Sequence, residues 1–123
     1  MQLLVLDDSD MMRNIIVKTL LAAGLEDDEI HQAANGVQAL RLLNSESFDV
    51  LLLDIVMDGV DGISVLKEAR VLQPKARVIM CSTFSKIETV KELIDIGIHD
   101  FVVKPFSAER LKEAVLKQRD FVQ

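Results

Sequence analysis

Short apolar segments recur along the chain and predict the strands of a sheet. Four of them contain no polar residue apart from a cysteine, namely 3–6, 50–53, 78–81 and 101–103. Unbroken apolar runs, as opposed to alternating ones, are typical of parallel strands that are covered on both faces. A weaker run at residues 29–33 predicts a fifth strand.

The stretches between these segments carry local signals for helices. In the first half of the chain, Ser9 can cap a helix that ends at Gly24, and Asn35 can cap one that begins at Gly36. Short polar side chains satisfy the amide groups of a first helical turn, and glycine accepts the left-handed conformation that often ends a helix. Two helices are therefore predicted there.

The second half carries further helix signals of the same kind. A helix is expected to open at Gly62 and to stop before Pro74, whose ring cannot continue it. Ser85 and Glu88 are spaced as a capping box, in which each side chain accepts a hydrogen bond from the backbone N–H of the other residue. Gly97 is expected to close that helix.

Taken together, the pattern predicts one α/β domain. Ser107 can cap a last helix, which is expected to run nearly to Gln123 and to leave no output domain. Five strands that alternate with five helices make a doubly wound fold, because neighbouring parallel strands need right-handed crossover connections. No repeat or flexible linker interrupts the pattern, so a single domain over residues 1–123 is expected.

Composition narrows the class of protein. Half of the residues are hydrophobic and 28% are charged, which is a globular composition, and no apolar run is long enough to span a membrane. A net charge of -6 argues against a protein held on nucleic acid by phosphate contacts. The single cysteine cannot form an internal disulfide and the amino terminus does not resemble a signal peptide, so a reducing, cytoplasmic setting is expected.

Chemically active side chains follow the predicted strands. Asp7 and Asp8 come after the first strand, Asp54 after the third, Ser82 after the fourth and Lys104 after the fifth. Ligands of open parallel sheets bind beyond the carboxyl ends of the strands. Three carboxylates, a hydroxyl and an ammonium group are therefore expected on one rim.

The residue types on this rim favour phosphoryl chemistry. Three crowded carboxylates would repel one another unless a cation neutralised them, and Mg²⁺ is a hard cation that prefers oxygen ligands. Asp54 would then be a nucleophile towards phosphorus. Lys104 and Ser82 are suited to stabilise phosphoryl oxygens, because phosphoryl transfer depends mainly on positioning and charge neutralisation.

These residues resemble those of a known family, the CheY-like receiver domains of bacterial two-component response regulators. The resemblance covers essentially the whole chain. Each motif alone is common, but their order and their crossover-length spacing are specific. The motifs are Asp7-Asp8 after an apolar strand, Asp54 in LLLDIVMDGVDG, Ser82 at the end of VIMCS, and Lys104-Pro105-Phe106 after FVV.

The resemblance implies a fold and a site. The fold would be the flavodoxin-like (βα)5 sandwich, with a five-stranded parallel sheet of order 2-1-3-4-5. Asp54 would accept a phosphoryl group from a histidine kinase. Asp8, Asp54 and the backbone carbonyl of Val56 would bind Mg²⁺, with Asp7 assisting. The peptide bond between Lys104 and Pro105 would be cis.

The resemblance also implies a switch. A phosphoryl group adds charge and strong acceptor oxygens, so Ser82 and Lys104 would be drawn towards it. The movement would pass through Thr83 to the aromatic ring of Phe101. We expect the face formed by the fourth helix, the fifth strand and the fifth helix to change its affinity for a partner.

The chain departs from the family pattern at several positions. Asp58 stands where proline is usual, and Thr83 is larger than the usual alanine or glycine. Phe101 lacks the hydroxyl of a common tyrosine. Val56 and Phe84 offer no polar group to orient a water, which predicts slow loss of the phosphoryl group.

Two other functions share parts of this pattern. A metal-dependent phosphohydrolase with an aspartyl nucleophile, similar to the haloacid dehalogenases, would carry D-x-D after the first strand and a cap, whereas this chain has D-D-S and no length for a cap. A receiver-like binding module without phosphorylation would not need the intact set of active residues. The leading interpretation is therefore a signalling domain that catalyses only its own phosphorylation and slow dephosphorylation.

The expected partners follow from that interpretation. They are a histidine kinase or phosphotransfer protein and a downstream protein target, without nucleic acid binding or membrane insertion. A monomer is expected, with a phosphorylation-dependent dimer as the alternative. An acidic partner would suit the basic residues of the last two helices, although a solvated surface explains them equally well; they are Lys86, Lys91, Arg110, Lys112, Lys117 and Arg119.

Overall fold

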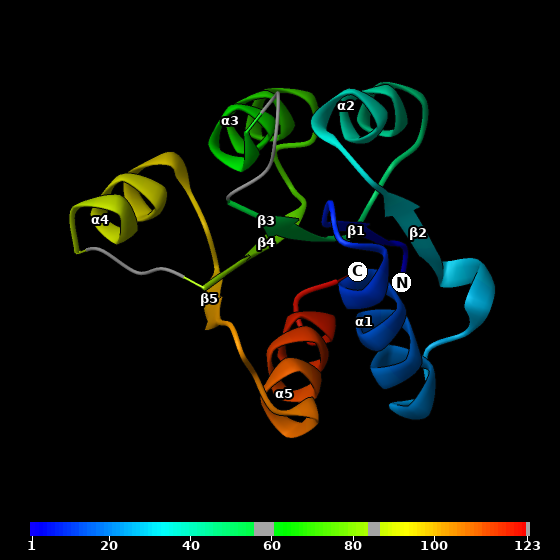
Figure 1. The fold of residues 1–123 in the computed structure, drawn as a ribbon. Coiled ribbons are helices and arrows are strands. Elements are labelled where there is room, and N and C mark those ends of the chain that lie inside the picture. Colours follow the sequence, from blue (N-terminus) through cyan, green and yellow to red (C-terminus); the bar gives the residue numbers. More distant parts are fainter. Residues whose placement is uncertain (56–60, 84–86, 123) are drawn as a thin grey trace.

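Five parallel strands form one sheet in the order β2-β1-β3-β4-β5 (Figure 1). The structure is a computed structural model and describes residues 1–55, 61–83 and 87–122. The strand order and the five predicted strands are confirmed, each to within one residue at either end. The strands are β1 Leu3–Leu6, β2 Ile30–Ala33, β3 Val50–Asp54, β4 Arg77–Ser82 and β5 Asp100–Val103.

Helices cover both faces of this sheet. Figure 1 shows α1 and α5 on one side and α2, α3 and α4 on the other. Each side has its own apolar core: Leu43, Val65 and Leu93 pack in one, and Ile16 and Leu111 in the other. The helices are α1 Asp10–Ala22, α2 Gly36–Ser45, α3 Gly62–Leu72, α4 Ile87–Ile96 and α5 Ala108–Arg119.

The predicted helix caps are present where the structure describes them. The Ser9 hydroxyl accepts from Met12 N–H at 3.1 Å. Asn35 and Ser107 cap α2 and α5 in the same way. The capping box proposed for Ser85 lies outside the described residues. These caps place the first turn of each helix directly after the carboxyl end of a strand.

Two segments differ from the sequence prediction. A short 3-10 helix, η1 Asp27–Glu29, precedes β2, because the Glu29 carboxylate folds back to accept from Glu26 N–H at 2.7 Å and from the terminal amine of Met1 at 3.0 Å. Glu29 is therefore not part of the strand. At the other end, α5 stops at Arg119 and a turn follows, in which Phe121 N–H donates to Gln118 O at 3.0 Å.

No helix in the described ranges is both long and apolar enough to cross a bilayer.

Candidate functional site

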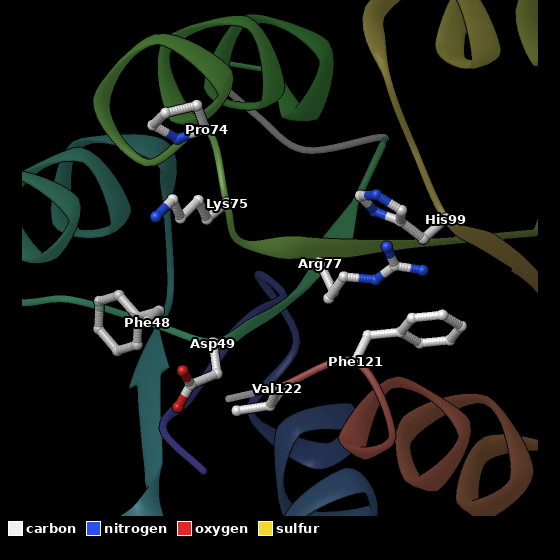
Figure 2. A pocket seen from close by; sticks show the side chains of 8 residues that line it. All are labelled: Phe48, Asp49, Pro74, Lys75, Arg77, His99, Phe121 and Val122. Carbon is white, nitrogen blue, oxygen red and sulfur yellow. The ribbon is translucent and has the colours of Figure 1, made fainter.

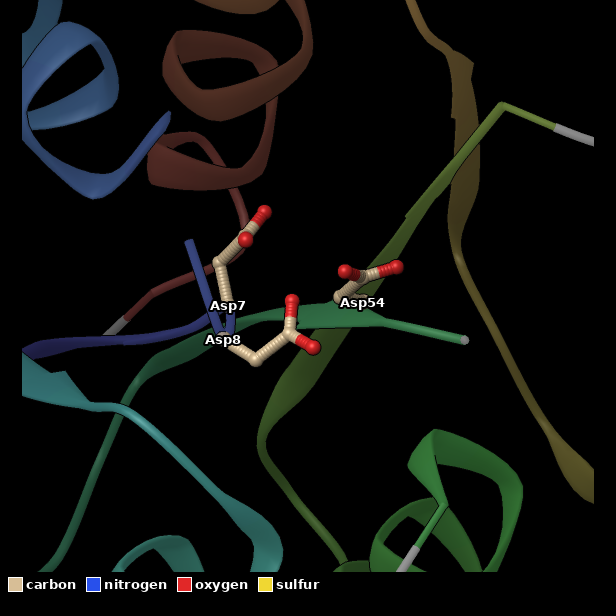
Figure 3. Close-up of side chains that lie close together, drawn as sticks. All are labelled: Asp7, Asp8 and Asp54. Atoms are coloured by element: carbon tan, nitrogen blue, oxygen red, sulfur yellow. The ribbon is translucent and has the colours of Figure 1, made fainter. Parts of the chain in front are cut away.

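Three carboxylates meet where β1 and β3 end (Figure 3). One carboxylate oxygen from each of Asp7, Asp8 and Asp54 lies within 4.8 Å of the other two. Asp7 and Asp54 are 2% and 6% exposed, whereas Asp8 is exposed to solvent. The parallel strands therefore bring together the acids that the sequence predicted at this rim.

The ammonium group of Lys104 bridges two of these acids. Its Nζ lies 2.6 Å from Asp7 Oδ2 and 3.3 Å from Asp54 Oδ2. Burial alone lowers the pKa of Lys104, but the hydrogen bond to Asp7 and the negative charges of Asp54 and Asp7 outweigh it and raise the pKa above its usual value. The lysine therefore remains a cation in the pocket.

The loop that carries Lys104 is held against β4. Lys104 N–H donates to Ser82 O at 2.7 Å, and the bond between Lys104 and Pro105 is cis, as the resemblance implied. Ser82 is the last residue of β4 and is 1% exposed. Its register partner on β5 is Val103, the residue before Lys104. Ser82 and Lys104 are thus neighbours at the rim.

A close backbone approach explains why a glycine follows β3. Gly62 N–H donates to Ile55 O at 3.1 Å at the start of α3. A Cβ atom on Gly62 would lie 1.8 Å from the carbonyl oxygen of Asp54. Only glycine lets α3 begin this close to the end of β3, which supports the backbone of Asp54.

Asp7 has additional partners that the sequence did not predict. Its Oδ1 accepts from Ser9 N–H at 2.9 Å, and its carbonyl oxygen accepts from Arg13 on α1. Arg13 also donates to Asp10, three residues earlier on the same helix. This spacing was the signal available in the sequence, because residues three apart on a helix are neighbours. Arg13 and Ser9 hold Asp7 in place.

Cys81, beside Asp54 in the register of β3 and β4, belongs to the core. Burial raises the pKa of its thiol to about 12, against the attraction of Lys104. The thiol therefore stays protonated at neutral pH and is not a nucleophile.

Of the two predicted switch residues, Thr83 lies at this rim and Phe101 lies within β5, in register with Met80. Thr83 is exposed and follows Ser82 directly. Phe101 on β5 is half-buried and packs against the core shared by α2, α3 and α4. Val56, Asp58 and Phe84 lie outside the described residues.

An ion pair that the sequence did not predict adjoins Phe101. Arg110 on α5 donates to both carboxylate oxygens of Asp100, at 2.9 and 3.3 Å, and to Phe101 O at 3.1 Å. The hydrogen bond to Asp100 raises the pKa of Arg110. This contact ties α5 to β5 at the face where the switch was expected.

The acidic cluster fits a divalent cation. Three carboxylates and one ammonium leave two negative charges uncompensated within a few ångströms, and carboxylate oxygens are hard ligands of the kind that Mg²⁺ prefers. An exposed Asp8 beside two buried acids leaves the cluster open to solvent on one side. Residues Asp7, Asp8 and Asp54 could therefore hold a metal ion.

Comparisons with known proteins identify the family. The family model for the response regulator receiver domain matches residues 3–116. The chain therefore belongs to the receiver domains of response regulators and is a CheY-like receiver domain. It is a phosphorylation-activated signalling switch of a two-component system.

Individual relatives extend over nearly the full chain. The chemotaxis protein CheY of Bacillus subtilis (strain 168) is 39% identical over 116 residues, which cover 94% of this chain and 95% of that protein. Sporulation initiation phosphotransferase F of the same organism is 31% identical, covering 94% and 91%. The structure of Vibrio cholerae chemotaxis protein CheY4 is 29% identical, with a TM-score of 0.86 and coverage of 94% and 96%.

Proposed function

We propose that Asp54 is the phosphoacceptor of this receiver domain and that Asp7, Asp8, Asp54 and the Val56 carbonyl bind Mg²⁺. The observation that carries the proposal is the position of Lys104, whose Nζ lies 3.3 Å from Asp54 Oδ2 within a cluster of three carboxylates. A carboxylate flanked by a cation and further acids is suited to accept a phosphoryl group, since neutralisation of phosphoryl charge is the main requirement.

The transfer itself needs little covalent chemistry from the protein. An oxygen of Asp54 attacks phosphorus while the bond from phosphorus to an imidazole nitrogen of the donor breaks. That nitrogen keeps the electron pair and takes a proton from solvent. Bound Mg²⁺ supplies positive charge for the phosphoryl oxygens.

Lys104 and Ser82 stabilise the product. The raised pKa of Lys104, which the hydrogen bond to Asp7 and the charges of Asp54 and Asp7 sustain against burial, keeps its ammonium charged. Lys104 then pairs with one phosphoryl oxygen, and the Ser82 hydroxyl donates to another. The backbone hydrogen bond from Lys104 N–H to Ser82 O keeps the two residues adjacent while their side chains turn towards the phosphoryl group.

The change at the rim is transmitted to the face formed by α4, β5 and α5. Movement of Ser82 shifts Thr83, which follows it, and makes room for a different position of the Phe101 ring. Arg110 binds the Phe101 carbonyl at 3.1 Å, so a shift of β5 alters the position of α5. A downstream protein that binds this face would distinguish the two states, either as a monomer or through a phosphorylation-dependent dimer.

The same proposal implies a class of phosphoryl donor and a cellular compartment. The donor is a histidine kinase or phosphotransfer protein, and we expect the protein in the cytoplasm, where its single cysteine stays reduced. Beyond its own phosphorylation and slow dephosphorylation, no enzymatic activity is proposed.

Incubation with Mg²⁺ and acetyl phosphate, followed by intact mass, tests the proposal. Wild-type protein should gain the mass of one phosphoryl group, and Asp54→Asn should gain none. Asp95→Asn, at an exposed position of α4, is the matched control and should behave as wild type. An adduct that persists in Asp54→Asn would disprove the assignment. Continuous turnover of the phosphodonor far beyond one equivalent would indicate a phosphohydrolase instead.

A further inference from the structure

A cavity of about 610 Å³ lies at the end of the sheet opposite to Asp54 (Figure 2). Asp49 precedes β3, Arg77 begins β4 and His99 precedes β5, so the cavity is at the amino ends of these strands. Its volume is in the range of sites for small organic ligands. None of the described residues of the phosphorylation site lines it.

Arg77 is oriented in this cavity by two contacts. Its Nε donates to Gln118 Oε1 at 3.0 Å, and Gln118 is itself 1% exposed. The guanidinium carbon lies 4.1 Å from the centre of the Phe121 ring. Within the described ranges, the two terminal nitrogens of Arg77 have no hydrogen-bond partner. A guanidinium that is held in this way presents a planar fork suited to a pair of anionic oxygens.

The charges around the cavity favour an anion. Lys75 also lines it, and among the described residues Asp49 is the one acidic residue on its wall. The Asp49 carboxylate is already engaged, since Oδ2 accepts from Gln2 N–H at 2.7 Å. Among the described lining residues, two cations therefore outnumber one carboxylate, and that carboxylate already accepts a hydrogen bond.

His99 adds a donor to this wall without adding charge. Its Nδ1 accepts from Val78 N–H at 2.8 Å, so the proton of the ring is on Nε2. Burial lowers the pKa of His99, and the positive charges of Arg77 and Arg70 lower it further. The imidazole is therefore neutral near pH 7, and the lowered pKa reflects the positive charge of the nearby arginines.

Two aromatic residues line the cavity, the buried Phe48 and the exposed Phe121. Figure 2 shows Phe48 and Phe121 on opposite sides of the view, with Arg77 between them. Phe48 is fixed by Gln73, whose Oε1 accepts from Phe48 N–H at 2.7 Å, and by the edge contact of His31 at 5.3 Å. Phe121 is 57% exposed, so a flat apolar group has aromatic surface to cover.

We propose that this cavity is a binding site for a small aromatic carboxylate. The carboxylate pairs with the terminal nitrogens of Arg77, with Lys75 nearby, and the aromatic ring of the ligand packs on the exposed ring of Phe121. The site is separate from the phosphorylation site, and its occupancy does not depend on Asp54.

Amide NMR titration of the full chain with benzoate tests the site. We expect saturable shifts at Arg77, His99 and Phe121, with benzamide, the uncharged analogue, binding at least about tenfold more weakly. Inorganic phosphate separates the two features of the ligand, since it offers oxygens without a ring and should also bind more weakly than benzoate. Equal shifts with benzoate and benzamide, or shifts that centre on other residues, would overturn the proposal.

Substitutions of the lining residues show which side chains contribute to benzoate binding. Arg77→Met removes the fork and keeps an apolar side chain, and it should weaken benzoate binding by about tenfold or more. Lys112→Met removes a cation from α5 outside this cavity and should bind as wild type. Phe121→Leu, which retains Arg77, provides a second test and should weaken binding several-fold if the ring forms a wall. Unchanged affinity in Arg77→Met or in Phe121→Leu would refute the site, and Asp54→Asn should bind benzoate like wild type.

Discussion

Val78 and His99 are joined by two reciprocal hydrogen bonds at the start of β4 and β5. His99 N–H donates to Val78 O at 2.8 Å, and Val78 N–H donates to His99 Nδ1 at 2.8 Å. The imidazole thus accepts the hydrogen bond of Val78, the second residue of β4, in place of a backbone carbonyl. Because Nδ1 accepts a hydrogen bond, the native structure requires the neutral ring.

This pair predicts that stability falls in mild acid. Burial, with Arg77 and Arg70, lowers the pKa of His99 in the folded state, so the unfolded chain binds the proton more readily. The contribution of His99 is therefore complete above the unfolded pKa of about 6.5 and is lost as the pH falls from there through the folded pKa. Urea unfolding at about pH 7.5 and about pH 5.5 measures it.

His99→Asn is the control for this prediction. The Asn amide oxygen offers an acceptor to Val78 but does not titrate. The decrease in the free energy of unfolding between the two pH values should be smaller in the variant than in wild type. The same decrease in both proteins would show that other groups cause the pH dependence.

Mg²⁺ should stabilise the protein through the three clustered acids. At tenfold excess over its dissociation constant, the ion should raise the free energy of unfolding by about 1.4 kcal/mol. Asp8→Asn removes one of the crowded carboxylates, so it should stabilise the metal-free protein by roughly 1 kcal/mol and weaken the Mg²⁺ effect. Urea unfolding in EDTA and in MgCl₂ gives both quantities, and Asp95→Asn is the control. An unchanged response to Mg²⁺ in Asp8→Asn would remove Asp8 from the metal site.

Gly62→Ala should harm both the fold and the site. The new Cβ would lie 1.8 Å from Asp54 O and 2.8 Å from Ile55 Cα, so backbone must shift. We expect a loss of roughly 2–3 kcal/mol in the free energy of unfolding and slower phosphorylation by acetyl phosphate. Ser64→Ala, at an exposed position of the same helix, should change stability by less than about 0.5 kcal/mol. Wild-type stability and phosphorylation in Gly62→Ala would contradict the close approach.

A double-mutant cycle should show coupling between Arg110 and Asp100. Their contact is bidentate but partly solvated, with exposed side-chain fractions of 36% and 19%, so the coupling free energy should be about 0.5–1 kcal/mol. Arg110→Gln, Asp100→Asn and the double variant, unfolded in urea, measure it. Salt should reduce the coupling, because partly exposed charges are screened. A coupling near zero would mean that the pair does not fasten α5 to β5.

The sequence was most informative where local chemistry decides the structure. Apolar runs such as Leu3–Leu6 located the strands, and caps such as Ser9 located helix starts, since both depend on neighbouring residues. The rim residues Asp54 and Lys104 followed from the rule that parallel strands end at the same edge. The order of the strands came from the family resemblance, because periodicity does not say which strands are neighbours.

Contacts between distant segments escaped prediction. Arg110 could be recognised as basic, but its pairing with Asp100 depends on how α5 lies against β5. Glu29 was predicted as a strand residue. Its bond to the Met1 amine could not be foreseen, because it joins segments that no sequence spacing relates. The same holds for Gly62, whose need to be glycine appears only when α3 is placed beside Asp54.

The buried thiol of Cys81 also makes the protein its own reporter of unfolding. A maleimide or similar alkylating reagent cannot reach a side chain that is 2% exposed and stays protonated. Labelling therefore requires β4 to open, and in excess reagent, when labelling outpaces reclosing, the labelling rate equals the opening rate. Comparing that rate before and after phosphorylation would show whether phosphorylation slows the opening of β4. No fluorophore or engineered cysteine is required.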